Sequence, residues 1–222
     1  MIFIIDFDGT LAKQDTVDAL LERFAPAAWE SVESEWLAGH ITAVECMQQQ
    51  IRMVKADRIT LENFFRDIQL DPHFDAFQQY VSQFATLAVV SDGLDHAIKV
   101  ALQHNGLAHL PVHANHLHFL ADGTDISFPH LNPNCNAGNG VCKCAVAQSY
   151  AATSGRPIVL VGDGKSDACL AHQADVVFAK GSLITYCEQH QIPHYAFQTF
   201  ADVLSVVKDW PINAPQAVAS QL

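Results

Sequence analysis

The chain has 222 residues, of which 50% are hydrophobic and only 16% are charged, so it can bury a core and disorder is excluded. Its formal net charge of −12 argues against a nucleic-acid partner, because affinity for a phosphate backbone comes largely from lysine and arginine. No apolar run reaches the roughly 18 residues of a membrane span, and the N-terminus lacks the marks of a signal peptide. Six cysteines are too few for a disulfide scaffold, so we expect a cytoplasmic protein without a membrane partner.

The first predicted element is a buried strand, because residues 2–5 form a continuous apolar run that ends in the polar turn Asp6-Phe7-Asp8-Gly9-Thr10. From there to about residue 85 the apolar spacing is helical. Thr42 and Glu45 form a capping box at the start of the third helix, and Asp71-Pro72 is expected to cap the fifth. The five helices are predicted around residues 17–24, 29–37, 42–54, 61–68 and 71–84.

Strands and helices alternate through the rest of the chain. Strands are predicted at 87–90, 112–120, 124–128, 158–161 and 175–178, and helices at 94–105, 141–154 and 166–172. This alternation predicts an α/β fold with an open, Rossmann-like parallel sheet. The helical block between the first two strands is too long for one crossover. We therefore expect a catalytic core of residues 1–12 and 80–222 with an inserted helical cap of residues 13–79.

Polar residues follow three of the buried strands, and a lysine opens a later helix. The four elements are Asp6-x-Asp8-x-Thr10, Ser91-Asp92-Gly93, Lys143, and Gly162-Asp163-Gly164-x-x-Asp167. Each has an ordinary explanation when taken alone: a helix cap or Asx turn, a serine N-cap, a solvated lysine, a second cap. Because parallel strands end at one edge of a sheet, one site there could collect all four elements, and carboxylate oxygens at this spacing suit a hard cation.

In order, spacing and strand context, these four motifs resemble those of the haloacid dehalogenase-like superfamily, over roughly residues 1–12 and 80–190. The resemblance implies that Asp6 is the nucleophile and forms an aspartyl-phosphate, while Asp8 acts as general acid and base. It also implies that Ser91, Asp92 and Lys143 bind phosphate. Mg²⁺ would be held by Asp6, the Asp8 carbonyl and Asp163, with Asp167 in support. Since dehalogenases lack an aspartate at the position of Asp8 and the P-type pumps carry threonine there, phosphate hydrolysis or transfer is favoured.

An all-helical insertion after the first motif resembles the cap of the phosphoserine phosphatase-like branch. Within that branch, three segments look closest to the 2-hydroxy-3-keto-5-methylthiopentenyl-1-phosphate phosphatases of methionine salvage: Ser91-Asp92-Gly93, residues 39–46, and Gly140-Val141-Cys142-Lys143. Asp92 departs from the Ser-Gly-Gly of phosphoserine phosphatases. Asp15 and Arg52 stand near the positions where those enzymes contact the substrate amine and carboxylate, although a solvated helix arginine explains Arg52 equally well.

The expected function is therefore a Mg²⁺-dependent phosphomonoesterase, a phosphoric monoester hydrolase, acting on a small phosphorylated metabolite. The salvage intermediate, phosphoserine and other small phosphomonoesters remain open as substrates. A phosphomutase is disfavoured by the few cationic residues of the cap, and a catalytically silent phosphate-binding protein by the intact motifs. Cys135, Cys142 and Cys144 could pack as small side chains, form a Cys135–Cys142 disulfide, or bind zinc with His130. His116 and His118 are expected on one face of a strand.

Overall fold

The computed structural model describes residues 1–135, 138–155 and 157–210. The chain divides into two compact units. The first unit consists of Met1–Lys13, Gln69–Val90 and Lys143–Leu222, and the second of Gln14–Ile68 and Ser91–Cys142. Each unit is thus assembled from segments far apart in the sequence.

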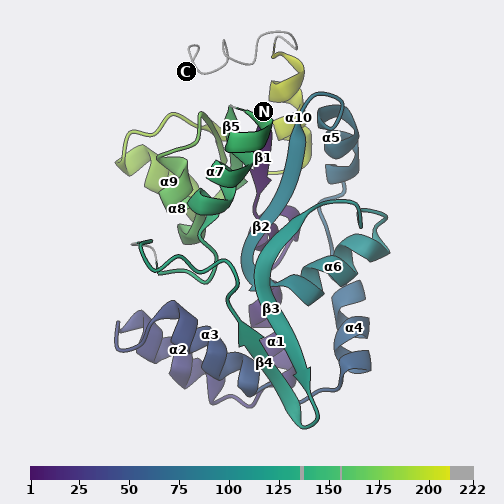
Figure 1. The fold of residues 1–222 in the computed structure, drawn as a ribbon, viewed down its shortest axis with the longest axis vertical. Helices are drawn as coiled ribbons and strands as arrows, with labels where there is room; N and C mark the ends of the chain where they lie inside the picture. Colours follow the sequence, from purple (N-terminus) through teal and green to yellow (C-terminus); the bar gives the residue numbers. More distant parts are fainter. Residues whose placement is uncertain (136–137, 156, 211–222) are drawn as a thin grey trace. The chain divides into compact units, whose positions relative to one another are not determined.

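A parallel sheet forms the centre of the first unit. Strand β1 (Ile2–Ile5) lies between β2 (Thr86–Leu94) and β5 (Ile158–Gly162) (Figure 1). Next to β5 come β6 (Val176–Ala179) and β7 (Tyr195–Ala196). The full strand order is β4-β3-β2-β1-β5-β6-β7. Every residue of β1 is buried, as a central strand covered on both faces requires. The α/β class and the mostly parallel sheet predicted from the sequence are confirmed.

Aromatic packing joins two helices of the first unit to this sheet. Phe200 of α10 (Phe200–Lys208) lies 4.8 Å from Phe74 and 5.0 Å from Phe77, both in α5 (Phe74–Val81), between ring centroids. Phe77 in turn meets Phe3 of β1 edge to face at 5.5 Å. These large apolar rings bury the base of β1 and fix the strand that carries Asp6 at its end. The remaining helical elements of this unit are η1 (Phe7–Leu11), α7 (Lys143–Ser154), η2 (Lys165–Asp167), α8 (Ala168–Ala171) and α9 (Gly181–Gln189).

The second unit combines helices with an antiparallel hairpin. Its elements are α1 (Thr16–Phe24), α2 (Trp29–Leu37), α3 (Ala43–Arg52), α4 (Arg58–Arg66), α6 (Asp95–His104), β3 (Val112–Leu120) and β4 (Gly123–Ser127). The predicted capping box of Thr42 and Glu45 is confirmed at the start of α3. The Thr124 hydroxyl, at 2.6 Å from the Ile51 carbonyl oxygen, ties β4 to the end of α3. Among the described residues, no helix combines the length and the apolar character that a bilayer crossing requires.

Two local predictions were wrong. Asp71 does not cap α5, whose N-cap is His73. Its carboxylate instead accepts hydrogen bonds from the backbone N–H groups of His73 and Phe200, so it links two segments 129 residues apart. Strand β2 does not stop at Val90 but continues to Leu94, and α6 begins only at Asp95. Ser91 therefore lies in a strand and not at a helix N-terminus.

The two compact units and the two sequence-based domains divide the chain differently. The five predicted helices do lie between β1 and β2, but residues 91–142, expected in the core, cluster with residues 14–68. Residues 69–79, expected in the cap, cluster with the first unit. The division into a catalytic core of 1–12 and 80–222 and a cap of 13–79 remains a prediction about function.

The cysteines and paired histidines have ordinary surroundings. None of the six cysteines forms a disulfide, so the Cys135–Cys142 bridge is excluded, and Cys142 and Cys144 are buried. In the described part of the chain, no cysteine joins a group of three or more side chains that could hold a metal ion. His116 and His118 do share a face of β3, with ring centroids 4.6 Å apart, and their polar partners are Asp95 and Ser127 respectively.

Candidate active site

Asp6 lies at the carboxyl end of β1, where the strand passes into the turn η1. Its backbone N–H still continues the sheet, at 2.9 Å from the Val161 carbonyl oxygen of β5. Its side chain is 7% exposed, and Oδ1 accepts from the Phe7 N–H at 2.8 Å and lies 2.8 Å from Nζ of Lys143. Both described contacts use Oδ1. The carboxylate is thus oriented through one oxygen, while Oδ2 is left for another partner.

Lys143, the first residue of α7, connects two of the acidic residues. Nζ lies 2.8 Å from Oδ1 of Asp6 and 2.6 Å from Oδ1 of Asp167, and it also donates to Oγ of Ser166 at 3.1 Å. The lysine side chain is 2% exposed and that of Asp167 is 0% exposed. Charged groups so far from water require partners, and here each has one. The alternative of a solvated lysine is therefore excluded, and the structure brings Lys143 to Asp6, as the motif predicted.

Asp167 is held by the backbone as well as by Lys143. Its Oδ2 accepts from the N–H groups of Asp163 and Gly164, at 3.1 and 3.2 Å. Both oxygens are therefore engaged inside the protein. This arrangement fixes the loop after β5, on which Asp163 stands, relative to the first turn of α7.

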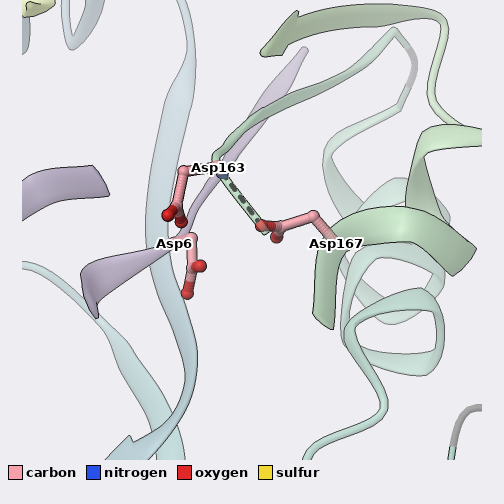
Figure 2. A group of neighbouring side chains, drawn as sticks. All are labelled: Asp6, Asp163 and Asp167. Carbon is pink, nitrogen blue, oxygen red and sulfur yellow. Dashed lines mark hydrogen bonds between the residues drawn. The ribbon is translucent and has the colours of Figure 1, made fainter. Parts of the chain in front are cut away.

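Asp163 completes the acidic group. One oxygen from each of Asp6, Asp163 and Asp167 lies within 4.8 Å of the others, and Figure 2 shows the three side chains converging from β1 and from the segment after β5. Oδ1 of Asp163 accepts from the Thr10 hydroxyl at 3.0 Å. That bond joins the turn after β1 to the turn after β5, two neighbouring parallel strands.

Two glycines make this close approach sterically accessible. Gly9 has φ of +67°, and a Cβ atom there would overlap the carboxylate of Asp163. A Cβ on Gly162 would in the same way overlap the carboxylate of Asp167. Glycine tolerates both the left-handed backbone and the near contact, whereas any larger residue would displace an acidic side chain.

The carboxylates repel one another, and burial adds to that cost. Burial and then the charge of Asp167 raise the pKa of Asp6 well above its usual value, while Lys143 opposes the rise. Burial and Asp167 likewise raise the pKa of Asp163. A divalent cation would relieve this repulsion, and the donor set of carboxylate oxygens is the one that Mg²⁺ and Ca²⁺ prefer. The acidic group therefore fits a hard metal ion.

Ser91 and Asp92, predicted to bind phosphate, belong to the second unit. The Ser91 hydroxyl is buried and accepts from the Gly93 N–H at 2.9 Å. Oδ1 of Asp92 accepts from the Val141 N–H at 2.7 Å, and the Asp92 carbonyl accepts from the Asn115 side-chain amide at 2.5 Å. Asp92 thus ties the end of β2 to β3 and to the segment before α7. Phosphate binding by Ser91 and Asp92 stays a prediction.

Asp15 and Arg52, predicted to contact the substrate, also lie in the second unit. Asp15 is the N-cap of α1 and accepts from the N–H groups of Val17 and Asp18. Arg52 forms a two-pronged ion pair with Asp125 of β4, at 3.0 and 3.2 Å. Both side chains are therefore used by the fold, and their contact with a substrate remains a prediction.

Asp8 stands in the η1 turn in an extended conformation, with φ of −66° and ψ of 132°.

Sequence reasoning missed two side chains of this site. The Thr10 hydroxyl bonds Asp163, although the sequence marks Thr10 only as the last residue of the first motif. Lys180, directly after β6, has Nζ 3.4 Å from the Thr10 carbonyl oxygen, and none of the four motifs includes it. A lysine at the end of a buried parallel strand was the available signal, because strand β6 ends at the same edge as β1 and β5.

Comparisons of the sequence with known proteins indicate the family of the chain. The family described as Putative Phosphatase matches residues 1–192. A protein from Exiguobacterium sibiricum is 32% identical over 216 residues, which cover 95% of this chain and 98% of the relative. One from Brevibacillus brevis is 27% identical over 213 residues, covering 94% and 95%. Both relatives are named 2-hydroxy-3-keto-5-methylthiopentenyl-1-phosphate phosphatase.

Solved structures show the same fold at lower identity. A phospho-aspartyl intermediate analogue of phosphoserine phosphatase matches with a TM-score of 0.68 and 19% identity, over 93% of this chain and 97% of that one. A haloacid dehalogenase family hydrolase from Salmonella enterica serovar Typhi matches with a TM-score of 0.75 and 17% identity, over 95% and 72%. The solved structures share the fold, and the family match over residues 1–192 together with relatives matched over nearly their whole length shows that the chain belongs to the Putative Phosphatase family.

Proposed function

We propose that the protein hydrolyses a small phosphomonoester, with Asp6 as the nucleophile and Mg²⁺ as the cofactor. The observation that carries this proposal is that the Asp6 carboxylate is held through only one of its two oxygens. Oδ1 is held by the Phe7 N–H and by Lys143, which orients Oδ2 for attack on phosphorus. A pre-oriented nucleophile removes much of the entropic cost of bringing the reacting atoms together.

The chemistry of the chain's own residues takes two displacement steps. In the first, Oδ2 of Asp6 forms a bond to phosphorus, the bond to the leaving oxygen breaks, and Asp8 gives that oxygen a proton. In the second, Asp8 takes a proton from water, the water oxygen bonds to phosphorus, and the Asp6–phosphate bond breaks. Lys143 lies against Asp6 and would hold a phosphoryl oxygen as charge develops, and Ser91 would supply a second contact.

Burial and repulsion among the carboxylates raise the pKa of Asp6, and that repulsion supports a metal cofactor. An ionised nucleophile among Asp163 and Asp167 requires positive charge, and Lys143 supplies only one unit. Asp6, Asp163 and the Asp8 carbonyl would hold the metal ion, and Asp167 would support them, because both of its oxygens are already engaged. When bound, Mg²⁺ supplies charge neutralisation between the carboxylates and an anionic phosphate.

For the substrate, we propose 2-hydroxy-3-keto-5-methylthiopentenyl-1-phosphate, the compound in the names of the relatives, which would place the protein in methionine salvage. Phosphoserine is the alternative. Two observations weigh against it: Arg52, needed for the carboxylate, is paired with Asp125, and Asp15, needed for the amine, caps α1. Asp92 departs from the phosphoserine phosphatase motif as well.

The decisive experiment is a screen of purified protein with Mg²⁺ against a panel that includes the salvage intermediate, phosphoserine and p-nitrophenyl phosphate. We expect the highest kcat/KM on the salvage intermediate. A preference for phosphoserine, lost on Arg52→Ala, would replace the substrate assignment without changing the reaction. Absence of phosphate release from every compound, across Mg²⁺, Mn²⁺ and Co²⁺, would favour a silent phosphate-binding protein and overturn the proposal.

A further inference from the structure

Lys180 is a second lysine next to the acidic group, on a different element from Lys143. It stands between β6 and α9, and its backbone N–H donates to the Gly162 carbonyl oxygen at 3.0 Å, immediately before Asp163. Its side chain is half-buried, with Nζ 3.4 Å from the Thr10 carbonyl oxygen and 5.4 Å from the centroid of the Phe197 ring. A backbone carbonyl and an aromatic face together direct the ammonium group.

The charge of Lys180 faces carboxylates. Burial lowers the pKa of Lys180, and attraction by Asp163, followed by Asp71 and Asp6, opposes that shift. In turn, Lys180 is one of the groups that hold down the pKa of Asp163. The site therefore contains two cations: Lys143, paired directly with Asp6 and Asp167, and Lys180, on the side of Asp163.

Thr10 is the residue through which Lys180 reaches the catalytic turn. The Thr10 hydroxyl donates to Asp163, and the Thr10 carbonyl accepts from Lys180. Thr10 is 1% exposed, so water does not replace either partner readily. The same turn, Phe7–Leu11, carries Asp8 two residues earlier. The hydroxyl and the carbonyl of Thr10 are thus held by the segments that follow β5 and β6.

We propose that Lys180 is a positioning residue that fixes the Phe7–Leu11 turn, and with it Asp8, while its charge offsets that of Asp163. This inference rests on the proposed role of Asp8 in phosphomonoester hydrolysis. The hydrogen bond to Thr10 is long, at 3.4 Å, and it depends on the positive charge of the ammonium group to hold the turn. A neutral side chain would both loosen the turn and leave the acidic group one positive charge short.

Loss of the Lys180 charge should lower kcat but raise the affinity for a divalent metal ion. These opposite changes distinguish the proposed role from a general loss of structure. A loosened turn misplaces Asp8 and lowers kcat, by about 10- to 100-fold. A missing cation beside Asp163 makes the site more negative, so a divalent metal ion should bind about three- to tenfold more tightly. A purely structural defect would weaken metal binding and activity together.

The test compares Lys180→Met with Lys180→Arg and with Lys208→Met. Lys208 is a matched control, because its Nζ also lies over an aromatic ring, that of Tyr80 at 5.9 Å, in the same unit. Turnover of p-nitrophenyl phosphate with saturating Mg²⁺ gives kcat and KM. Calorimetric titration of the metal-free proteins with Mn²⁺ gives metal affinity without any substrate.

We expect Lys180→Met to show the lower kcat with an unchanged KM and the tighter Mn²⁺ binding. Lys180→Arg should recover wild-type Mn²⁺ affinity and most of kcat, and Lys208→Met should match wild type in both. If Lys180→Met turns over like Lys208→Met, or binds Mn²⁺ more weakly than wild type, the inference is overturned. A wild-type protein without turnover would instead overturn the proposed function, so the two failures are distinguishable.

Discussion

Lys143 and Asp167 form an ion pair that is closed to solvent: Nζ and Oδ1 are 2.6 Å apart, and the side chains are 2% and 0% exposed. Removing two charges from water costs several kcal/mol for each ion, which their attraction offsets only with good geometry and further hydrogen bonds. Asp167 has those bonds, from the N–H groups of Asp163 and Gly164. The main effect of the pair is therefore to fix the positions of Lys143 and Asp167 in the site, and its net contribution to stability is small.

Breaking this pair should destabilise the protein unequally from its two sides. Lys143→Met leaves Asp6 and Asp167 buried without their cation, and we expect a loss of about 3–5 kcal/mol in the free energy of unfolding. Asp167→Asn leaves Lys143 with Asp6, so the loss should be smaller. Urea denaturation in EDTA measures both. Arg58→Met removes an exposed pair with Glu62 and should cost less than about 1 kcal/mol. Added Mg²⁺ should reduce the difference in the free energy of unfolding between Lys143→Met and wild type. It should leave the difference between Arg58→Met and wild type unchanged.

The proposed division of labour between Asp6 and Asp8 predicts different defects. Asp6→Asn should abolish turnover with the fold intact, because no nucleophile remains. Asp8→Asn should reduce kcat by about 10²- to 10⁴-fold, because neither proton transfer is assisted. With p-nitrophenyl phosphate, whose leaving group needs little protonation, Asp8→Asn should accumulate a phosphoryl group on Asp6.

Mass spectrometry of the quenched Asp8→Asn protein detects that adduct. Asp122→Asn, in the exposed turn between β3 and β4, serves as the control and should behave as wild type. Substantial turnover by Asp6→Asn, or a phosphorylated residue other than Asp6, would contradict the assignment.

Steric demands at the loop after β5 predict a contrast between two neighbouring glycines. A Cβ at Gly162 would overlap the Asp167 carboxylate, whereas one at Gly164 would meet no atom within 4 Å. Gly162→Ala should lower the free energy of unfolding by about 1–3 kcal/mol, as overpacking does, and should reduce kcat by displacing Asp167. Gly164→Ala, with φ of −136°, should leave both quantities near wild type. Equal effects from the two substitutions would show that the loop is not tightly packed around Asp167.

The raised pKa of Asp18 in α1 predicts that this side chain makes the stability of the protein depend on pH. Burial, and then the charges of Asp15, Glu33 and Glu22, raise its pKa to about 6. The folded state thus binds the Asp18 proton more tightly than the unfolded state, so this group's contribution to stability falls as pH rises from about 4 to about 6. Asp18→Asn should therefore stabilise the protein at pH 7 but not at pH 4. Because the side chain is only partly buried, screening by solvent should keep the gain below about 1 kcal/mol.

Asp125 supplies a control of opposite sign for that measurement. Its hydrogen bond from Arg52 lowers its pKa, so its contribution is present at neutral pH and is lost as pH falls through the folded-state pKa. Asp125→Asn should destabilise the protein at pH 7 and have less effect in acid. Thermal unfolding at a series of pH values measures both variants, and parallel pH profiles for the two would contradict the electrostatic explanation.

Much of the site could be anticipated because the motifs are local. A buried apolar strand followed at once by Asp6, or by Gly162-Asp163, places those carboxylates at a strand end whatever else the chain does. The capping box at Thr42 is likewise a matter of residues three apart. The role of Asp71 could not be predicted in this way, because its second partner, the Phe200 N–H, is contributed by a distant segment.

By itself, then, the sequence determined the α/β class, the five helices after β1 and the identity of the acidic residues. These features depend on hydrophobic periodicity and on short-range turn chemistry. Tertiary structure alone decided that Lys143 is buried between Asp6 and Asp167, that Arg52 pairs with Asp125, and that Lys180 lies against Thr10. The physical reason is that the residue type determines the charge of a side chain, which the sequence therefore shows. Its solvent exposure and its partner depend on segments that come together only when the chain folds.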